Sequence, residues 1–498
     1  MIEIHNLTIK TKKDFRTLIE NFNFSTQKED KIVIIGEEGN GKSTLLKLIY
    51  DEQLIANYCT FEGKVLKNNY SLGFLSQELS AKEKKMTVTE FFTENSWSKE
   101  LLKVMDDFGV ESLVSEKRIG DFSGGERFKY RFLNIFAKNP DVLLLDEPTN
   151  DLDIGMIEWL ERFIQQTTMP VIFISHDETF ISNTANAIIH MELIKRKQIP
   201  KYSFSREPYE KYLLNRENNL NKQEQTARKQ AADYKKQMNK WQDVWKKAEH
   251  QHQNVSRSDP RLQKKIKSLK NQKKRMEKAT EEFLEVPSIE EASEFRFDSS
   301  VYVHRSKKIL ELSIEALQID NKQLSKNIKL SITGPEKVAI IGENGVGKTT
   351  LLKRIMDELT ECCSLKIGYM PQNYEDLLDP TQTPIKFLET TGNKETMTKA
   401  FNRLGSMKFT HDEMQQTIGN LSGGQKAKLL LLKMILERCE ILVLDEPTRN
   451  FSPLTTPVLY SALAEFGGVI ISISHDRRYL NEVATTVYEL TSEGLIKQ

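Results

Sequence analysis

Gly36-Glu37-Glu38-Gly39-Asn40-Gly41-Lys42-Ser43 follows a short apolar segment, Lys31 to Ile35, and precedes a helical pattern over residues 44–50. A glycine-rich turn between a strand and a helix is the P-loop pattern. Its glycines allow successive backbone N–H groups to face phosphate oxygens. Lys42 is placed to reach the β- and γ-phosphates, and the Ser43 hydroxyl to bind Mg²⁺. The stretch therefore predicts an α/β nucleotide-binding fold.

The same pattern occurs again in the second half of the chain. Gly342-Glu343-Asn344-Gly345-Val346-Gly347-Lys348-Thr349 follows the apolar segment Lys337 to Ile341. Self-similarity on this scale indicates an internal repeat. The sequence therefore predicts two ATPase domains of one kind.

Each P-loop is followed by a buried-strand pattern that ends in two carboxylates. The first is Val142 to Leu145 with Asp146 and Glu147, and the second is Ile441 to Leu444 with Asp445 and Glu446. The aspartate can hold Mg²⁺, and the glutamate can orient the attacking water. The alternative interpretation is that the two acids lie at the strand end by chance. The P-loop upstream argues against that interpretation.

Two further motifs accompany each P-loop. Ser123-Gly124-Gly125-Glu126 and Ser422-Gly423-Gly424-Gln425 are small residues at a predicted helix start, where exposed N–H groups favour an anion. His176 and His475 each follow an apolar strand and could contact a γ-phosphate. A single histidine in such a place is usually structural.

These motifs, in one order and present twice, resemble the ATP-binding cassette (ABC) superfamily over nearly the whole chain. The resemblance implies that Gln77 and Gln372 are the Q-loop glutamines. It also implies head-to-tail pairing, with each ATP between one P-loop and the signature of the other cassette. The sequence departs from the pattern at Glu38, where the family often has Asn. The backbone there can still bind phosphate, so we expect the side chain to cause only fine tuning. The D-loops also differ. The first cassette has Asn150-Asp151-Leu152-Asp153, whereas the second has Arg449-Asn450-Phe451-Ser452-Pro453.

The resemblance assigns the site residues. The catalytic residues are Glu147, Glu446, His176 and His475. ATP is bound by Gly36, Glu37, Glu38, Gly39, Asn40, Gly41, Lys42, Ser43, Thr44, Gln77, Ser123, Gly124, Gly125, Glu126, Gly342, Glu343, Asn344, Gly345, Val346, Gly347, Lys348, Thr349, Thr350, Gln372, Ser422, Gly423, Gly424 and Gln425. Mg²⁺ is bound by Ser43, Gln77, Asp146, Thr349, Gln372 and Asp445. Phe15 is the candidate for stacking on adenine in the first cassette, and Ile319 lies in the corresponding region of the second.

A long charged segment, residues 206–286, joins the two repeats. Its apolar residues follow the spacing of a helical seam. They are Leu213, Leu220, Ala227, Ala231, Tyr234, Met238, Trp241, Trp245 and Ala248, then Leu262, Ile266, Leu269, Met276 and Phe283. Polar residues and Pro260 interrupt the pattern between His250 and Pro260, which predicts an antiparallel helical hairpin with its tip there.

The hairpin segment is strongly basic. Lys211 to Glu285 contains 20 Lys or Arg and 10 Asp or Glu, a net charge of +10, whereas the whole chain is +1. This asymmetry favours a polyanionic partner, although a solvated coiled coil is also rich in charge. Trp241, Trp245 and Tyr234 could stack on bases, but their spacing favours packing against the second helix.

Length and composition are consistent with domains at 1–205, 206–286 and 287–498. We find no run of about 18 apolar residues and no signal-peptide core in residues 1–13, so a cytoplasmic protein without a membrane span is expected. The cysteines show neither metal-ligand nor disulfide spacing, as in a reducing compartment.

Two cassettes joined by a basic hairpin resemble the ABC-F proteins, which act on the ribosome. The segment from Thr448 to Pro453 resembles the antibiotic-resistance branch of the Vga, Lsa and Msr kind. The resemblance implies a monomer that enters the tRNA exit site, contacts large-subunit rRNA and the peptidyl-site tRNA, and protects the ribosome from drugs. The alternatives are a housekeeping ABC-F translation factor, the ATPase subunit of a drug exporter, and a DNA-repair ATPase.

Overall fold

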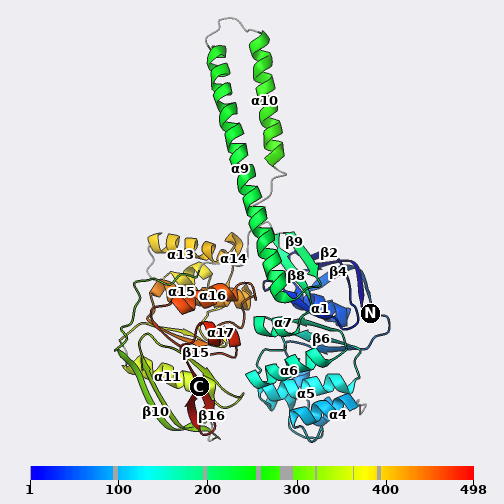
Figure 1. Cartoon of the computed structure of the whole chain (residues 1–498), viewed down its shortest axis with the longest axis vertical. Coiled ribbons are helices and arrows are strands. Elements are labelled where there is room, and N and C mark those ends of the chain that lie inside the picture. The colour runs from blue at the N-terminus through cyan, green and yellow to red at the C-terminus, as the bar shows by residue number, and fades with distance from the viewer. Residues whose placement is uncertain are drawn as a thin grey trace. The chain divides into compact units, whose positions relative to one another are not determined.

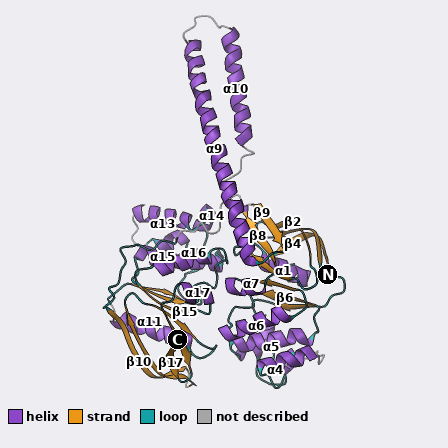
Figure 2. Ribbon diagram, in the orientation of Figure 1, coloured by secondary structure: helices purple, strands orange, loops and turns teal. Residues whose placement is uncertain are grey.

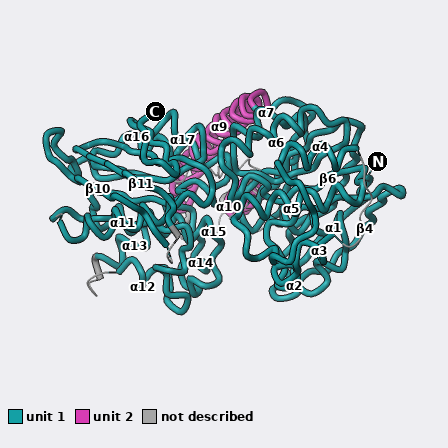
Figure 3. Tube along the Cα trace, turned by 90° about the horizontal axis from the view of Figure 1, so that it is seen from below, with its two compact units in different colours: residues 1–209, 290–498 teal, residues 210–289 magenta. Residues whose placement is uncertain are grey.

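The computed structural model describes residues 2–92, 99–194, 199–253, 260–280, 295–319, 322–362, 364–389 and 394–498. Figure 1 shows the whole chain, and Figure 2 shows the distribution of helices and strands. The chain divides into two compact units (Figure 3), one of residues 1–209 and 290–498 and the other of residues 210–289. The larger unit contains both α/β cassettes. We call the part built by β1 to β9 the first cassette and the part built by β10 to β17 the second cassette.

The first cassette is built on a six-stranded sheet in the order β5-β6-β7-β3-β8-β9, in which only β9 runs antiparallel. Its strands are β1 Glu3–Thr11, β2 Thr17–Ser25, β3 Lys31–Ile35, β4 Cys59–Leu66, β5 Leu72–Leu75, β6 Val142–Asp146, β7 Val171–Ile174, β8 Ala187–Leu193 and β9 Ile199–Ser205. Its α-helices are α1 Lys42–Tyr50, α2 Ala81–Lys85, α3 Val88–Phe91, α4 Lys99–Phe108, α5 Gly124–Ala137, α6 Ile154–Gln166 and α7 Glu178–Thr184.

The second cassette repeats this sheet with the order β13-β14-β15-β12-β16-β17, again with only the last strand antiparallel. Its strands are β10 Lys308–Ile319, β11 Lys322–Thr333, β12 Lys337–Ile341, β13 Ile367–Met370, β14 Ile441–Asp445, β15 Val469–Ile473, β16 Thr486–Thr491 and β17 Gly494–Lys497. Its α-helices are α11 Lys348–Cys362, α12 Pro384–Leu388, α13 Lys394–Ser406, α14 His411–Gln415, α15 Gly423–Glu437, α16 Thr456–Glu465 and α17 Arg477–Glu482.

The central strands consist of apolar runs because helices cover both faces of a parallel sheet. Every residue of β3 and β6 is buried, as is every residue of β14 and β15. In such a sheet the ligand site lies outside the carboxyl ends of the strands. That edge carries the P-loop after β3, Asp146 and Glu147 at the end of β6, and His176 after β7. The same order of motifs follows β12, β14 and β15.

From the sequence alone, the alternation of apolar and polar residues over Ile2 to Ile9 predicts an edge strand, and the structure shows this prediction to be wrong. β1 pairs with β2 on one side and with β4 on the other, so it is the middle strand of a three-stranded antiparallel sheet. Alternation reports that one face is buried and does not report how many neighbours a strand has. The second neighbour, β4, is supplied by residues far along the chain.

The smaller unit is a helical hairpin formed by α9, Tyr209–Gln253, and α10, Pro260–Thr280. Ala227, Ala248 and Leu269 of the predicted seam are buried. The indole Nε1 of Trp241 donates to the Leu269 carbonyl oxygen at 2.9 Å, and the Trp241 and Trp245 rings stack 5.2 Å apart. Trp241 therefore joins the two helices, as its spacing favoured, and Trp245 packs against it.

One residue of the predicted seam is not buried, and some others cannot be placed in the described part of the chain. Ala231 is exposed, so it is not a seam residue, while Gln230 beside it is half-buried. Residues 254–259 of the predicted tip, the Leu262 side chain and Phe283 lie outside what the structure describes.

Candidate nucleotide sites

The two P-loops have the same backbone geometry. Gly36 has φ of 142°, and a Cβ there would lie 2.2 Å from the Met191 carbonyl oxygen. Gly342 has φ of 146°, and its Cβ would lie 2.4 Å from the Leu490 carbonyl oxygen. Only glycine fits so close an approach at this φ, so each loop must begin with it.

The P-loop lysines fold back over their own loops. Lys42 Nζ donates to the carbonyl oxygens of Gly36 at 2.6 Å and Glu37 at 3.0 Å. Lys348 Nζ makes the equivalent contacts with Gly342 at 2.8 Å and Glu343 at 2.9 Å. Burial lowers the pKa of Lys348, against the raising effect of nearby Glu446. Each ammonium group is thus held at the mouth of a loop whose N–H groups can receive phosphate.

A hydroxyl and a carboxylate meet beside each P-loop. Ser43 Oγ donates to Asp146 Oδ1 at 2.9 Å, and Thr349 hydrogen-bonds Asp445. Burial raises the pKa of Asp146 to about 6 and also raises the pKa of Asp445. The second carboxylate oxygen of each aspartate is buried and accepts no hydrogen bond from any residue in the described ranges. A hydroxyl beside a buried carboxylate oxygen without a partner suits Mg²⁺, which prefers hard oxygen ligands.

The glutamates that follow these aspartates are held in an unusual backbone conformation. Glu147 and Glu446 both have φ of 51°, in the left-handed region that non-glycine residues rarely adopt. Their N–H groups donate to the carbonyl oxygens of Ile174 and Ile473, each at 3.0 Å. The neighbouring strand therefore fixes the backbone, and both residues expected to act on water are held in a strained conformation.

A histidine faces each glutamate. His176 Nε2 lies 3.0 Å from Glu147 Oε1, whereas His475 Nε2 lies 3.8 Å from Glu446 Oε1. Burial, helped by Asp445, raises the pKa of Glu446 to about 8. Burial lowers the pKa of His475 to about 4, so this imidazole is neutral at pH 7. A glutamate with a pKa near neutrality is suited to proton transfer.

The serine-glycine motifs begin helices, as predicted. Ser123 caps α5 and Ser422 caps α15, each through a capping box with the residue three positions later, Glu126 or Gln425. The amides of the first helical turn have no partner inside their own helix and are available to an anion.

The second P-loop and the first signature line one cavity of about 640 Å³. The second cassette contributes Lys348, Thr349, Gln372, Glu446 and His475, among others, and the first contributes Ser123, Gly124 and Asp151. Ile319 also lines this cavity. Residues from both cassettes thus surround one space, in the head-to-tail arrangement expected.

The D-loops contribute contacts between the cassettes at this cavity. Asn344 Nδ2 donates to the Asp151 carbonyl oxygen at 2.6 Å. Arg449 pairs with the Asp151 carboxylate at 3.1 Å. The arginine that distinguishes the second D-loop therefore has a partner in the first D-loop.

The first P-loop contacts the second signature through a residue whose role the sequence did not reveal. Glu38 Oε2 accepts a hydrogen bond of 2.6 Å from the backbone N–H of Gly424. We expected the side chain of Glu38 to matter little. The departure from asparagine was visible in the sequence, but its partner lies 386 residues away.

Some predicted site residues lie apart from the others. Gln77 lines a smaller cavity of about 240 Å³ together with Glu147, whereas Gln372 shares the large cavity with Thr349 and Asp445. Phe15 is 79% exposed on a turn, with φ of 55°.

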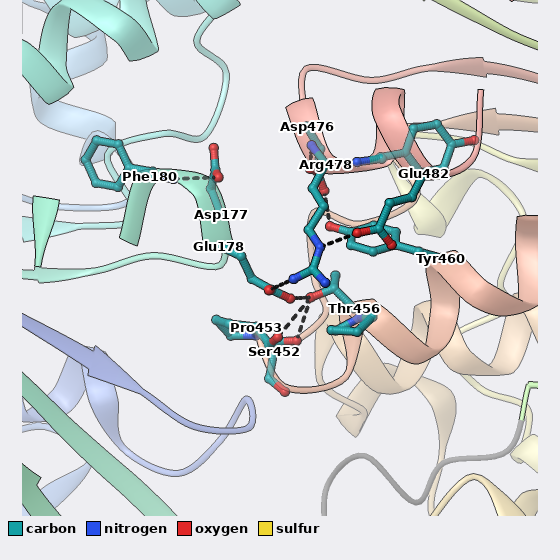
Figure 4. A network of polar contacts seen from close by, with 12 residues as sticks. Asp177, Glu178, Phe180, Ser452, Pro453, Thr456, Tyr460, Asp476, Arg478 and Glu482 are labelled. Atoms are coloured by element: carbon teal, nitrogen blue, oxygen red, sulfur yellow. Dashed lines mark hydrogen bonds and ion pairs between the residues drawn. The ribbon is translucent and has the colours of Figure 1, made fainter. Parts of the chain in front are cut away.

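A network of buried polar groups joins α7 to α16 and α17 (Figure 4). Glu178 forms an ion pair with Arg478, and its other oxygen accepts a hydrogen bond from Thr456 Oγ1 at 3.0 Å. Nearby, Arg477 pairs with Glu161 of α6. Burial raises the pKa of Glu178 to about 7, although the Arg478 charge opposes this. Glu178 lies two residues after His176, and Arg477 and Arg478 lie two and three residues after His475, so the network connects the histidine segments of the two cassettes.

Comparison with known proteins identifies the family to which the chain belongs. The family model described as ABC transporter matches residues 19–150 and 325–449, just over half of the chain. The chain belongs to the ABC transporter family. Each matched segment runs from a strand before the P-loop to the D-loop. As a member of this family the chain is an ATPase that uses ATP with Mg²⁺.

The relatives extend over nearly the whole chain. The ribosome protection protein VmlR of Bacillus subtilis (strain 168) is 29% identical over 514 residues, covering 100% of this chain and 88% of that protein. The ATP-binding protein Uup of Escherichia coli (strain K12) is 28% identical, with coverage of 96% and 79%. ABC transporter F family member 5 of Arabidopsis thaliana is 26% identical, with coverage of 95% and 73%. This ABC protein thus has tandem cassettes, and its relatives include proteins of the ABC-F family.

Among solved structures, the complex of archaeal ribosomal stalk protein aP1 with the ribosome recycling factor aABCE1 has a TM-score of 0.61 and 15% identity. It covers 99% of this ABC protein and 90% of that chain. At this identity the likeness supports the fold of two paired ATPase domains. No helix in the described part of the chain is long and apolar enough to cross a membrane.

Proposed function

We propose that this ABC-F protein binds the ribosome in an ATP-dependent manner, enters the tRNA exit site, and protects the ribosome from antibiotics. The antibiotics are those that act at the peptidyl-transferase centre or exit tunnel. The observation that carries the proposal is a basic helical hairpin on a chain whose two cassettes already share a head-to-tail nucleotide cavity. The full-length likeness to a ribosome protection protein supports it.

The residues at each composite site suggest how ATP is used. Lys42 and Lys348 would bind the terminal phosphates at their loops, with the signature amides of the other cassette completing the site. Mg²⁺, held through Ser43 and Asp146 or through Thr349 and Asp445, would neutralise phosphate charge. Glu147 and Glu446 would orient water and accept its proton, and His176 and His475 would hold those glutamates in place.

Binding between two cassettes makes ATP a stabiliser of their closed pair, because ATP contacts both only in that state. Hydrolysis removes the bridging phosphate and so weakens the pair. We propose that the closed pair is the ribosome-bound state and that hydrolysis leads to release.

The hairpin supplies the surface for nucleic acid. Its second helix carries exposed cations at Lys264, Lys265, Lys267, Lys270, Lys274 and Arg275. Helical RNA is bound largely through its phosphates and its shape, so such a helix face suits large-subunit rRNA and the peptidyl-site tRNA. Trp241 is used between the helices and Trp245 stacks on it, so we propose phosphate contacts as the main mode of binding.

The decisive experiment is co-sedimentation of the Glu147→Gln, Glu446→Gln double variant with ribosomes, with and without ATP. We expect the variant to pellet with ribosomes only when ATP is present. A protein that stays in the supernatant under both conditions would remove the main support for ribosome binding. The Lys42→Ala, Lys348→Ala chain is the control, because it should not pellet with ATP.

The second candidate is a housekeeping ABC-F factor that relieves stalled ribosomes. Uup, which is not named for ribosome protection, is similar to this chain to nearly the same degree as VmlR. Drug susceptibility of a deletion strain separates the two candidates. Resistance that falls on deletion and returns with the gene indicates protection, whereas unchanged susceptibility with slowed translation indicates the housekeeping role.

The hairpin tip gives a test of protection itself. Replacing residues 250–258 with a short Gly–Ser turn should leave ATP hydrolysis intact and abolish protection. Residues 254–258 lie outside the described ranges, so this proposal comes from the sequence. We further propose the domains 1–205, 206–286 and 287–498, a monomeric state and a cytoplasmic location without membrane attachment.

A further inference from the structure

The two composite sites differ in what one equivalent P-loop residue does. Asn344 in the second P-loop donates its amide to the Asp151 carbonyl oxygen at 2.6 Å, and it lies against Gly125 of the first signature. Glu38 in the first P-loop accepts the Gly424 N–H at 2.6 Å. Asn344 therefore binds a D-loop carbonyl oxygen and not a signature amide. Glu38, in contrast, binds the signature amide of Gly424 with its carboxylate.

The position that Glu38 occupies is suited to an anion. Gly424 lies in the first turn of α15, whose amides have no partner inside the helix. A carboxylate at such a turn is stabilised by the partial positive charge of the helix N-terminus. Gly423 also lies against the Glu38 carboxylate, so the acid fits closely between loop and helix.

The second composite site has an open cavity at the equivalent place. There the P-loop residues Lys348 and Thr349 line the same large cavity as Ser123 and Gly124 of the opposite signature. A terminal phosphate bound at Lys348 therefore faces the opposite helix start. At the first site the equivalent helix start already holds the negative charge of Glu38.

We infer that Glu38 makes the first composite site discriminate less between ATP and ADP than the second site does. The carboxylate competes with the terminal phosphate for the Gly424 amide and repels it. ADP lacks that phosphate and is not affected. Glu38 is therefore a specificity-determining residue for the nucleotide state at one of the two sites.

The consequence is that closure of the two sites depends on the terminal phosphate to different degrees. Both side chains bridge the cassettes, but Glu38 does so at the signature amide, whereas Asn344 does so at the Asp151 carbonyl oxygen of the D-loop. At the first site the carboxylate therefore takes the place of a terminal phosphate at the signature, and at the second site a terminal phosphate meets no carboxylate from Asn344 there. This inference rests on the proposed assignment of the P-loop residues and does not depend on ribosome binding.

The test measures nucleotide affinity in the full-length chain by titration calorimetry. Lys348→Ala disables the second P-loop, so that binding reports the first site. Within this background, Glu38 and Glu38→Gln chains are titrated with ADP and with the non-hydrolysable ATP analogue AMP-PNP. Glu38→Gln keeps the size of the side chain and an acceptor for Gly424, and it removes the charge.

We expect Glu38→Gln to tighten AMP-PNP binding about tenfold and to change ADP binding less than twofold. The unchanged ADP affinity also shows that the variant is folded. The reciprocal variant, Asn344→Glu in a Lys42→Ala chain, should weaken AMP-PNP binding about tenfold at the second site with ADP again unchanged.

Equal changes for both nucleotides, or an AMP-PNP to ADP ratio that stays within twofold, would overturn the inference while leaving the P-loop assignment intact. A Lys348→Ala chain that binds neither nucleotide would overturn the assignment of the first P-loop and the inference with it. Glu38→Asn provides a second variant, since it gives the first loop the residue of the second loop and should act in the same direction.

Discussion

Glu178 of α7 and Arg478 of α17 form an ion pair across the boundary between the two cassettes. The carboxylate is 5% exposed, and it is also hydrogen-bonded to Thr456. A buried charge that loses its partner is costly, which makes this pair a sensitive point in the association of the cassettes.

At pH 9, where Glu178 is ionised, replacing Arg478 with Ala should lower the free energy of unfolding by about 3 kcal/mol, because the charged carboxylate loses its buried cation. The thermal midpoint of the full chain measures the effect. Glu482→Ala is the matched control, since it removes the exposed partner of the same arginine and should cost less than about 0.5 kcal/mol. Equal shifts in the thermal midpoint for the two variants would show that the buried pair contributes no more to stability than the exposed pair.

Stability should depend on pH through Glu178. Burial raises its pKa to about 7 from an ordinary 4.5, so the folded chain binds more protons than the unfolded chain between these values. Stability contributed by this group is therefore greatest below pH 4.5 and falls as pH rises through 7, by roughly 3 kcal/mol in total.

Thermal midpoints of the wild-type and Glu178→Gln chains between pH 5 and 8 test this. The variant should lose less stability over that range, because glutamine does not titrate. Parallel curves for the two chains would contradict the raised pKa of Glu178. Other groups that titrate in this range, such as Asp177, are present in both chains and cancel in the comparison.

Removing the charge of the two glutamates that we propose to be catalytic should stop turnover and leave ATP binding. The Glu147→Gln, Glu446→Gln chain is expected to lose at least a hundredfold in phosphate release, since general-base catalysis contributes on that scale. Binding of AMP-PNP should stay within severalfold of wild type. Residual hydrolysis above a tenth of wild type would show that another group accepts the proton.

The aromatic core of the first cassette offers a stability test. Phe132 is fully buried and contacts the rings of Phe108, Trp159 and Phe163. Phe132→Ala should cost about 3 to 5 kcal/mol, because it leaves a cavity among these rings.

Phe15→Ala is the exposed control for this core variant and should change stability by less than about 0.5 kcal/mol. The same control tests the adenine role predicted for Phe15, since loss of stacking would weaken nucleotide binding at the first site. A Phe15→Ala chain with unchanged affinity would remove Phe15 as the adenine partner.

The hairpin should open when Trp241 is truncated. Trp241→Ala removes the hydrogen bond to Leu269, the stacking on Trp245 and the contact with Lys273. Faster trypsin cleavage within residues 209–280 is the expected result. Val244→Ala, on an exposed position of the same helix, should leave the cleavage rate unchanged. Equal rates for both variants would mean that the tryptophan does not hold the helices together.

Local patterns predicted most of what is local in this protein. Glycine at Gly36 and the serine caps at Ser123 and Ser422 follow from backbone geometry that neighbouring residues determine. The strand order repeats because the two halves share one pattern of apolar runs. The hairpin followed from helical spacing and a proline break.

Contacts between distant segments were not predictable in this way. The partner of Glu38 is 386 residues away, and Glu178 meets Arg478 across 300 residues. The middle position of β1 likewise depends on β4. In each case the residue type was visible in the sequence, but its neighbour was decided by how the elements pack.

The charges at the contact between the cassettes determine whether one half of the chain could replace the other. Glu161 and Glu178 come from the first half, and Arg477 and Arg478 come from the second. In a chain assembled from two copies of the first half, Glu178 would stand in the place of Arg477 and would face Glu161, so two acids would meet where unlike charges now meet. The two halves share one pattern of motifs, yet they are not interchangeable at this contact.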